Sequence, residues 1–315
     1  PMKESGLMLA GAMLVLFLAA ILSFPASCAD PEGNPAAANT GSLPPPDYIS
    51  GPRICGHASA TLAGLADADV TLAKSTLHIG YGHTSHGSQL MDGLGGLDAF
   101  KGGSGLYAVS REGSAGTLHL YEGDGYGSGD LDHDAGYAPD WIKETRDFLG
   151  TVDENGRGSA HPAFNVIMWS WCGQLSWYTA DQVRMDYREP MAALEADYPG
   201  VRFVYMTGHA DGTGLAGTLH LNNERIRQYC AANSKWLYDF NDIENWDPDG
   251  AYYGDRNVDD ACNYTSGDAS GNWALEWQAE HPGQWYQCDS AHSQPLNANR
   301  KAYAARRLFA ALAKR

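Results

Sequence analysis

The strongest constraint on the fold is a regular alternation of short apolar runs with amphipathic stretches, which begins near Leu77 and continues to the C-terminus. Each apolar run has the length of a strand that is buried on both faces, and apolar residues recur at helical spacing between the runs. This alternation is typical of a parallel sheet covered by helices on both faces. The predicted strands are residues 77–81, 118–121, 165–169, 201–206 and 235–240.

The first of these strands leads into a polar turn that contains Ser85. Gly82 ends the alternating pattern of residues 77–81, and leucines then recur at helical spacing at positions 90, 94 and 97. Ser85 is therefore predicted to lie at a strand-to-helix turn, where free backbone N–H groups and the helix dipole favour a developing negative charge. This is a suitable place for the nucleophile of an acyl-transfer reaction.

Composition excludes several classes of protein. The 315 residues are 43% hydrophobic and 19% charged, which suits one large globular domain with appendages and excludes a disordered or fibrous chain. The formal net charge is -17, so nucleic acid and anionic membrane surfaces are not expected partners.

The N-terminal part of the chain indicates export. Residues 1–29 combine Lys3, an apolar run and small residues, which is the pattern of an export signal. Cleavage before Cys28 would give a lipid-anchored protein, and cleavage after Ala29 would give a soluble one. Residues 30–57 are rich in Pro, Ala and Gly and are predicted to be a linker, followed by a domain over residues 58–315. Within that domain, residues 241–288 have no clear period and are interpreted as a long insertion or lid before the last helix.

Three polar turns follow predicted strands, and in a parallel sheet such turns meet at one edge. The first contains Ser85, the second contains Cys172 and Gln174, and the third contains His209 and Asp211. Near the other end of the chain, Asp289 and His292 lie three residues apart before the final helix. A local turn would let Asp289 orient His292 as a general base for the nucleophile.

This order of motifs resembles that of the SGNH (GDSL-like) hydrolase family over roughly residues 71–312. The resemblance rests on residues 83–87, which form a His-x-Ser-x-Gly block, and on the Asp-x-x-His of residues 289–292. It implies a flavodoxin-like three-layer α/β/α sandwich, no cofactor, and a serine esterase mechanism. In that mechanism Ser85 attacks the ester, His292 is the general base and Asp289 orients His292.

The remaining site residues follow from the same comparison. The oxyanion would be stabilised by the Ser85 N–H, a glycine N–H such as that of Gly173, and the side-chain amide of Gln174, which stands where the family has asparagine. Three histidines near these turns are candidate substrate-binding residues: His83, His86 and His209. Ser88 is a rival nucleophile, although its hydroxyl is expected to bond the local backbone.

Two kinds of metal site are alternatives. His83, His86 and His209 are possible transition-metal ligands, and acidic clusters supply oxygen ligands for calcium. The calcium candidates are Asp247, Asp249 and Asp255 in the insertion, with a further acidic group at 124, 130, 132 and 134.

The cysteines suit an exported protein. Apart from Cys28 there are five, so at least one stays unpaired. The predicted disulfide is Cys262–Cys288, with Cys55–Cys230 as a second pairing, which leaves Cys172 free in the second polar turn. A free cysteine at that position is either a buried structural residue or a nucleophile.

Together these features predict an exported serine esterase that removes acyl groups, acetyl above all, from a carbohydrate. One alternative is a non-catalytic surface protein of the same fold that binds a glycan or a cation. Another is a lipase or polyester hydrolase, which would require an apolar acyl groove.

Overall fold

The computed structural model describes residues 51–123 and 129–315. The predicted export signal, Cys28, most of the predicted linker and Asp124 lie outside the described residues. Within them, no helix is both long enough and apolar enough to span a membrane.

A seven-stranded, all-parallel sheet forms the centre of the protein, in the order β1-β7-β6-β5-β2-β4-β3. Helices cover both faces, so the predicted α/β fold is confirmed and is consistent with a flavodoxin-like three-layer sandwich. The strands are β1 Ile54–Cys55, β2 His78–Gly82, β3 Val109–Ser110, β4 Leu118–Glu122, β5 Val166–Trp169, β6 Arg202–Met206 and β7 Trp236–Tyr238.

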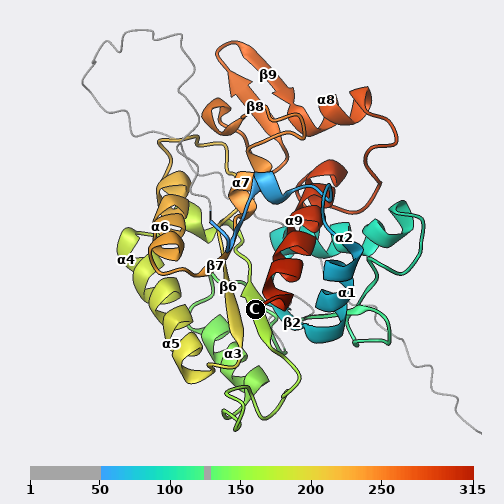
Figure 1. The fold of residues 1–315 in the computed structure, drawn as a ribbon. Helices are drawn as coiled ribbons and strands as arrows, with labels where there is room; N and C mark the ends of the chain where they lie inside the picture. The colour runs from blue at the N-terminus through green and yellow to red at the C-terminus, as the bar shows by residue number, and fades with distance from the viewer. Residues whose placement is uncertain (1–50, 124–128) are drawn as a thin grey trace, which may run out of the picture. The chain divides into compact units, whose positions relative to one another are not determined.

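The helices divide between the two faces of the sheet (Figure 1). One face carries α1 Asp67–Thr76, α2 Ser85–Phe100 and α9 Pro295–Ala313. The other face carries α3 Asp140–Leu149, α4 Ala180–Gln182, α5 Glu189–Asp197 and α6 Thr218–Ala232, with a π-helical turn over Val183–Arg188 between α4 and α5.

The α4–α5 segment begins with a capping box, and its irregular turn has a local cause. The Thr179 side chain accepts the N–H of Gln182, and the Gln182 side chain accepts the N–H of Thr179. Pro190 has no N–H to donate to the carbonyl of Asp186, four residues earlier. The indole N–H of Trp141 donates to that carbonyl instead, at 3.2 Å. The π-helical turn therefore ends where proline interrupts the helical hydrogen bonds.

The last helix buries charged side chains as well as apolar ones. In α9, Arg300, Lys301 and Arg306 are buried along with the apolar side chains. The helix packs against α1 and α2 and, near its N-terminal end, meets α7 (Phe240–Glu244) and α8 (Trp273–Glu280) of the insertion, so both its polar and its apolar faces are covered.

The insertion contains regular structure of its own. It includes α7 Phe240–Glu244, a 3-10 turn over Gly254–Arg256, the hairpin β8 Asn263–Ser266 and β9 Ala269–Asn272, and α8 Trp273–Glu280. Buried Tyr253, Trp273 and Trp277 form a small hydrophobic cluster there, separate from the main core. The predicted irregular segment is thus a compact subdomain attached beside α9 (Figure 1).

Candidate functional site

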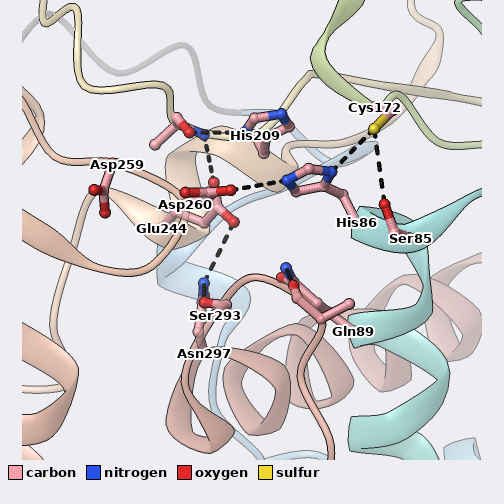
Figure 2. A network of polar contacts seen from close by, with 12 residues as sticks. Ser85, His86, Gln89, Cys172, His209, Glu244, Asp259, Asp260, Ser293 and Asn297 are labelled. Atoms are coloured by element: carbon pink, nitrogen blue, oxygen red, sulfur yellow. Dashed lines mark hydrogen bonds and ion pairs between the residues drawn. The ribbon is translucent and has the colours of Figure 1, made fainter. Parts of the chain in front are cut away.

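The site lies where the order of the sheet reverses. β2 is paired with β4 on one side and with β5 on the other. After β2 the chain forms β3 and β4 on one side of it, and then crosses to the other side to form β5. Ligands of open parallel sheets bind at the carboxyl ends of the strands at such a switch point. Ser85 begins α2 directly after β2, and Cys172 follows β5. Figure 2 shows these two residues side by side, with the Ser85 Oγ and Cys172 Sγ atoms 3.9 Å apart.

Gly87 lets the start of α2 approach the loop after β5. A Cβ atom at this position would overlap Ser170 Oγ and His83 Cβ and would stand 2.9 Å from the hydroxyl of Tyr81. The glycine of the His-x-Ser-x-Gly block is therefore required by close packing, because any side chain would push α2 away from this loop.

Asp134 joins the same two segments through hydrogen bonds. Its buried carboxylate accepts from Thr84 Oγ1 at 2.6 Å and from the Gly136 N–H at 2.8 Å. Burial raises the pKa of Asp134, and these bonds, with others from the Cys172 N–H and the Gln174 side chain, oppose the rise. The Gln174 amide predicted to stabilise an oxyanion thus hydrogen bonds to Asp134, which fixes the loop that carries Cys172.

His86 connects Cys172 to a carboxylate. Its Nδ1 atom lies 3.1 Å from Cys172 Sγ, and its Nε2 atom lies 2.9 Å from Asp260 Oδ2 (Figure 2). Burial lowers the pKa of His86, although the hydrogen bond to Asp260 opposes that shift. The pKa of Asp260 is lowered: burial raises it, but the hydrogen bond from His86 and the nearby imidazoles outweigh burial. A neutral imidazole that donates from Nε2 to Asp260 has a free Nδ1 lone pair directed at the thiol.

Two further histidines stack on the His86 ring. The His209 ring lies at 3.7 Å between centroids with an interplanar angle of 2°, and the His292 ring lies at 4.5 Å with an angle of 19°. His209 donates from Nδ1 to the Ala210 carbonyl at 2.7 Å, and its buried Nε2 atom has no hydrogen-bond partner in the described part of the chain. The predicted convergence of the first and third polar turns is therefore confirmed by direct ring contact.

A buried ion pair supports the loops that carry these histidines. Lys301 Nζ lies 2.6 Å from Glu244 Oε1, and both side chains are fully buried. Glu244 also accepts the backbone N–H of Ala210 at 2.6 Å, next to His209. Lys301 also donates to Gln89, whose own amide donates to the carbonyl of Ala291, next to His292. Residues of α2, α7 and α9 thus hold both loops.

The predicted triad is brought into one region without hydrogen bonds between its members. Among the described residues, the structure shows no hydrogen bond that links Ser85, Asp289 and His292 to one another. Ser85 is exposed at the first position of α2, and His292 is exposed and in the left-handed backbone region, with φ of 63°. Asp289 lies near Asp92, whose pKa is raised by burial and by the charge of Asp289.

The other predicted residues have defined positions. His83 Nε2 lies 2.8 Å from Glu122 Oε2, so this histidine is paired at the end of β4. Gly173 lies near His209: a Cβ atom added to Gly173 would stand 3.9 Å from His209 Nε2. Ser88 donates to the Ser85 carbonyl at 2.8 Å, as expected of a hydroxyl that bonds the local backbone.

Two predictions about cysteines and calcium are wrong for the described residues. All five described cysteines are free. Cys262 contacts Ser293, whereas Cys288 contacts Asn299 of α9, so the two thiols of the predicted disulfide have different partners. Neither Cys262–Cys288 nor Cys55–Cys230 is a disulfide. The aspartates of residues 247–255 do not converge on a cation site: Asp247 accepts the N–H groups of its own turn, at 2.9 and 2.8 Å.

The same holds for the two other calcium candidates of the insertion. Asp249 accepts the indole N–H of Trp277 at 2.8 Å. Asp255 forms a loose ion pair with its neighbour, with Oδ1 3.9 Å from Arg256 Nε. Within residues 51–123 and 129–315, the side chains grouped closely enough to hold a metal ion are a different set, His86, Asp260 and His292.

Asp260 is the functional candidate that the sequence did not identify. It lies in the insertion, 174 positions from His86, in a segment without periodicity. The sequence offered one weak signal, an insertion rich in Asp placed before the Asp-x-x-His motif.

Comparisons with known proteins leave the chain unassigned. No family model matches it. A search of curated proteins found no match, and a search of solved structures found none either. The resemblance to SGNH hydrolases therefore stays a prediction, and function is inferred from the geometry of the site.

Proposed function

We propose that this protein is an acyl-transfer hydrolase that cleaves carboxylic esters through a covalent intermediate on Cys172. The observation that carries the proposal is the position of His86, whose imidazole bridges the Cys172 thiol and the Asp260 carboxylate at 3.1 and 2.9 Å. A nucleophile, a base and a residue that orients the base are the parts that this chemistry needs.

The roles follow from the hydrogen bonds. His86 Nδ1 takes the proton of Cys172, and the thiolate attacks the ester carbonyl carbon to form a C–S bond. The C–O bond to the alcohol then breaks, and the leaving oxygen takes the proton from His86. In the second half, His86 accepts a proton from water and the resulting hydroxide attacks the thioester carbonyl carbon. The C–S bond then breaks, the acid is released, and Cys172 Sγ takes the proton back from His86. Asp260 stabilises the imidazolium that exists between these transfers.

The first turn of α2 is placed to stabilise the oxyanion. Ser85 is the first residue of this helix, and its hydroxyl lies 3.9 Å from Cys172 Sγ. The first backbone N–H groups of a helix have no partners within it, so they favour negative charge at this position. The backbone N–H of Ser85 thus supports the reaction by donating a hydrogen bond to the oxyanion.

Selectivity for Cys172 follows from the burial of the other described cysteines. Burial raises the pKa of Cys55 to about 11 and the pKa of Cys262 and of Cys288 to about 12, and it raises the pKa of Cys230 further. These four thiols therefore remain protonated and unreactive at neutral pH.

The serine esterase predicted from the sequence is the second candidate function. It is favoured by the exposed hydroxyl of Ser85 at the strand-to-helix turn and by the resemblance to SGNH hydrolases. In that case His292 would have to turn towards Ser85 when substrate binds. With either mechanism, we propose that the protein is exported and acts on an acyl ester of a carbohydrate. These two expectations come from the sequence.

The test is competitive labelling of the purified protein with iodoacetamide, which reports on thiols, and with a fluorophosphonate, which reports on activated serines. Hydrolysis of an aryl acetate is measured in parallel. We expect rapid alkylation of Cys172 that falls about 100-fold or more in His86→Gln, together with ester hydrolysis that is lost in Cys172→Ala. Ser88→Ala is the matched control for Ser85→Ala.

Each alternative has its own outcome. Fluorophosphonate labelling that is lost in Ser85→Ala and persists in Cys172→Ala would assign the reaction to serine. Alkylation of Cys172 that is indifferent to His86, without any ester hydrolysis, would contradict a hydrolase and favour the binding protein of the same fold.

A further inference from the structure

Three side chains beside the reactive thiol offer ligand atoms to a single point. One atom each from His86, Asp260 and His292 lies within 4.8 Å of the other two. The residues come from α2, from the insertion and from the loop before α9, so only the folded chain assembles them. His86 is buried, Asp260 is half-buried and His292 is exposed, which leaves an approach from solvent on the His292 side.

The donor set indicates the class of ligand. Two imidazole nitrogens and one carboxylate oxygen suit first-row transition metals, and three protein ligands with an open position are typical of reactive zinc sites. Ca²⁺ and Mg²⁺ prefer sets composed of oxygen atoms alone. Each imidazole must be neutral to bind a metal through its lone pair.

The surroundings of His86 fit a metal ligand. A histidine that binds a metal through one nitrogen usually donates from the other nitrogen to an acceptor that fixes the ring. His86 Nδ1 faces Cys172 Sγ at 3.1 Å, so the sulfur of the protonated thiol is the acceptor when Nε2 binds the metal. The His209 ring, stacked on the His86 ring at 3.7 Å between centroids, holds the plane of the imidazole.

The carboxylate of Asp260 is placed for the exchange of a proton for a metal ion. Its Oδ2 atom lies 2.9 Å from His86 Nε2, a spacing that holds one proton between the two atoms. A metal ion bound to both atoms would take the place of that proton, which would move to Nδ1 of the same imidazole. His292, with no hydrogen-bond partner among the described residues, is the ligand free to close on the ion.

We propose that Zn²⁺ or a similar divalent transition-metal ion binds between His86, Asp260 and His292, and that its binding switches off the thiol. The metal would occupy Nε2, so the single proton of His86 would lie on Nδ1 and His86 could not accept the proton of Cys172. The metal site stands on its own geometry. Its inhibitory effect rests on the proposed function.

The first experiment measures metal binding without reference to activity. Co²⁺ is titrated into the purified full-length protein, and its visible d–d absorption is followed, then reversed with Zn²⁺. We expect the bands of a protein-bound, low-symmetry ion, with affinity that falls about 100-fold or more in His292→Ala and in Asp260→Asn. His281→Ala and Asp259→Asn are matched controls that retain binding, because both residues lie in the insertion outside the cluster.

The second experiment measures the alkylation rate of Cys172 with and without saturating Zn²⁺. We expect Zn²⁺ to protect the thiol in the wild type and to protect it much less in His292→Ala. Protection that persists in His292→Ala would mean that the thiolate binds zinc directly, and it would overturn the switch. Absence of Co²⁺ bands, or bands unchanged in both ligand variants, would overturn the metal site.

The two proposals fail separately. Alkylation that depends on His86 in a protein without Co²⁺ bands leaves the hydrolase standing and removes the metal site. Co²⁺ bands that require His292 in a protein whose alkylation ignores His86 establish the metal site and remove its proposed link to thiol chemistry.

Discussion

The contact between α2 and α9 gives the sharpest test of the packing, because two glycines of the same helix face opposite surroundings. Gly93 is buried against α9, and Gly95 is exposed. A Cβ atom at Gly93 would lie 2.7 Å from the carbonyl carbon of Ala298, closer still to its oxygen, and 3.1 Å from Ala302 Cβ. A Cβ atom at Gly95 would meet no atom within 4 Å.

These distances set the sign of each substitution. Replacement of an exposed helical glycine by alanine stabilises a protein by about 0.5–1 kcal/mol. Gly95→Ala is expected to gain that amount. Gly93→Ala gains it too, but the new methyl overlaps a backbone carbonyl that cannot rotate away, and such overpacking costs about 3 kcal/mol or more at the upper end of its range. The net effect of Gly93→Ala is therefore a loss of about 2 kcal/mol.

Urea denaturation of the purified variants measures both effects, with the m-value as a check that unfolding stays cooperative. In a domain of this size each kcal/mol shifts the melting temperature by about 2–4 °C, so thermal denaturation separates the two variants as well. A Gly93→Ala protein as stable as Gly95→Ala would refute the close approach of α2 to α9, and with it the position of the loop that carries His292.

Three further predictions concern the site and its supports. Lys301→Met leaves the Glu244 carboxylate buried without its partner, so urea denaturation should show a loss of about 3–5 kcal/mol at pH 7. A loss of about 1 kcal/mol or less, the size expected of an exposed ion pair, would contradict a buried charged pair. The pKa of His86 is lowered from 6.5, so the acid limb of the pH profile of ester hydrolysis should lie below pH 6.5. Asp260→Asn should move that limb to still lower pH and reduce the rate at least about tenfold, because the carboxylate raises the pKa of His86 and stabilises the imidazolium; an unmoved limb would remove Asp260 from the mechanism. Gly87→Ala should slow alkylation of the active-site thiol about tenfold or more in a protein that still folds, as judged by circular dichroism, and an unchanged rate would show that helix α2 need not touch the loop after β5.

Sequence patterns were sufficient to predict five of the seven strands and the edge at which the site lies. The two-residue strands β1 and β3 were not predicted, and β1 lies within the predicted linker. Strands buried on both faces appear as continuous apolar runs, and this pattern located β2, β4, β5, β6 and β7 to within a few residues. Polar turns after such strands must share one edge of a parallel sheet, and this rule alone places Ser85 and Cys172 in the same region.

The sequence was least informative where polar side chains do the packing. α6 spans Thr218–Ala232, and polar side chains lie on its buried face. Asn222 and Asn223 are fully buried there, because Asn222 donates to the Leu175 and Tyr178 carbonyls and Asn223 accepts the Gly208 N–H. Hydrophobic periodicity cannot detect a helix face that is buried through hydrogen bonds.

The pairing of groups within the site depends on long-range packing. The sequence paired His292 with Asp289 because they are neighbours in the chain, whereas the fold pairs His86 with Asp260, which lies 174 residues away. Local spacing specifies which groups a single turn can bring together. Which carboxylate meets which imidazole across the sheet edge depends on how the insertion packs against α2 and α9, and that is set by the buried contacts of the whole domain.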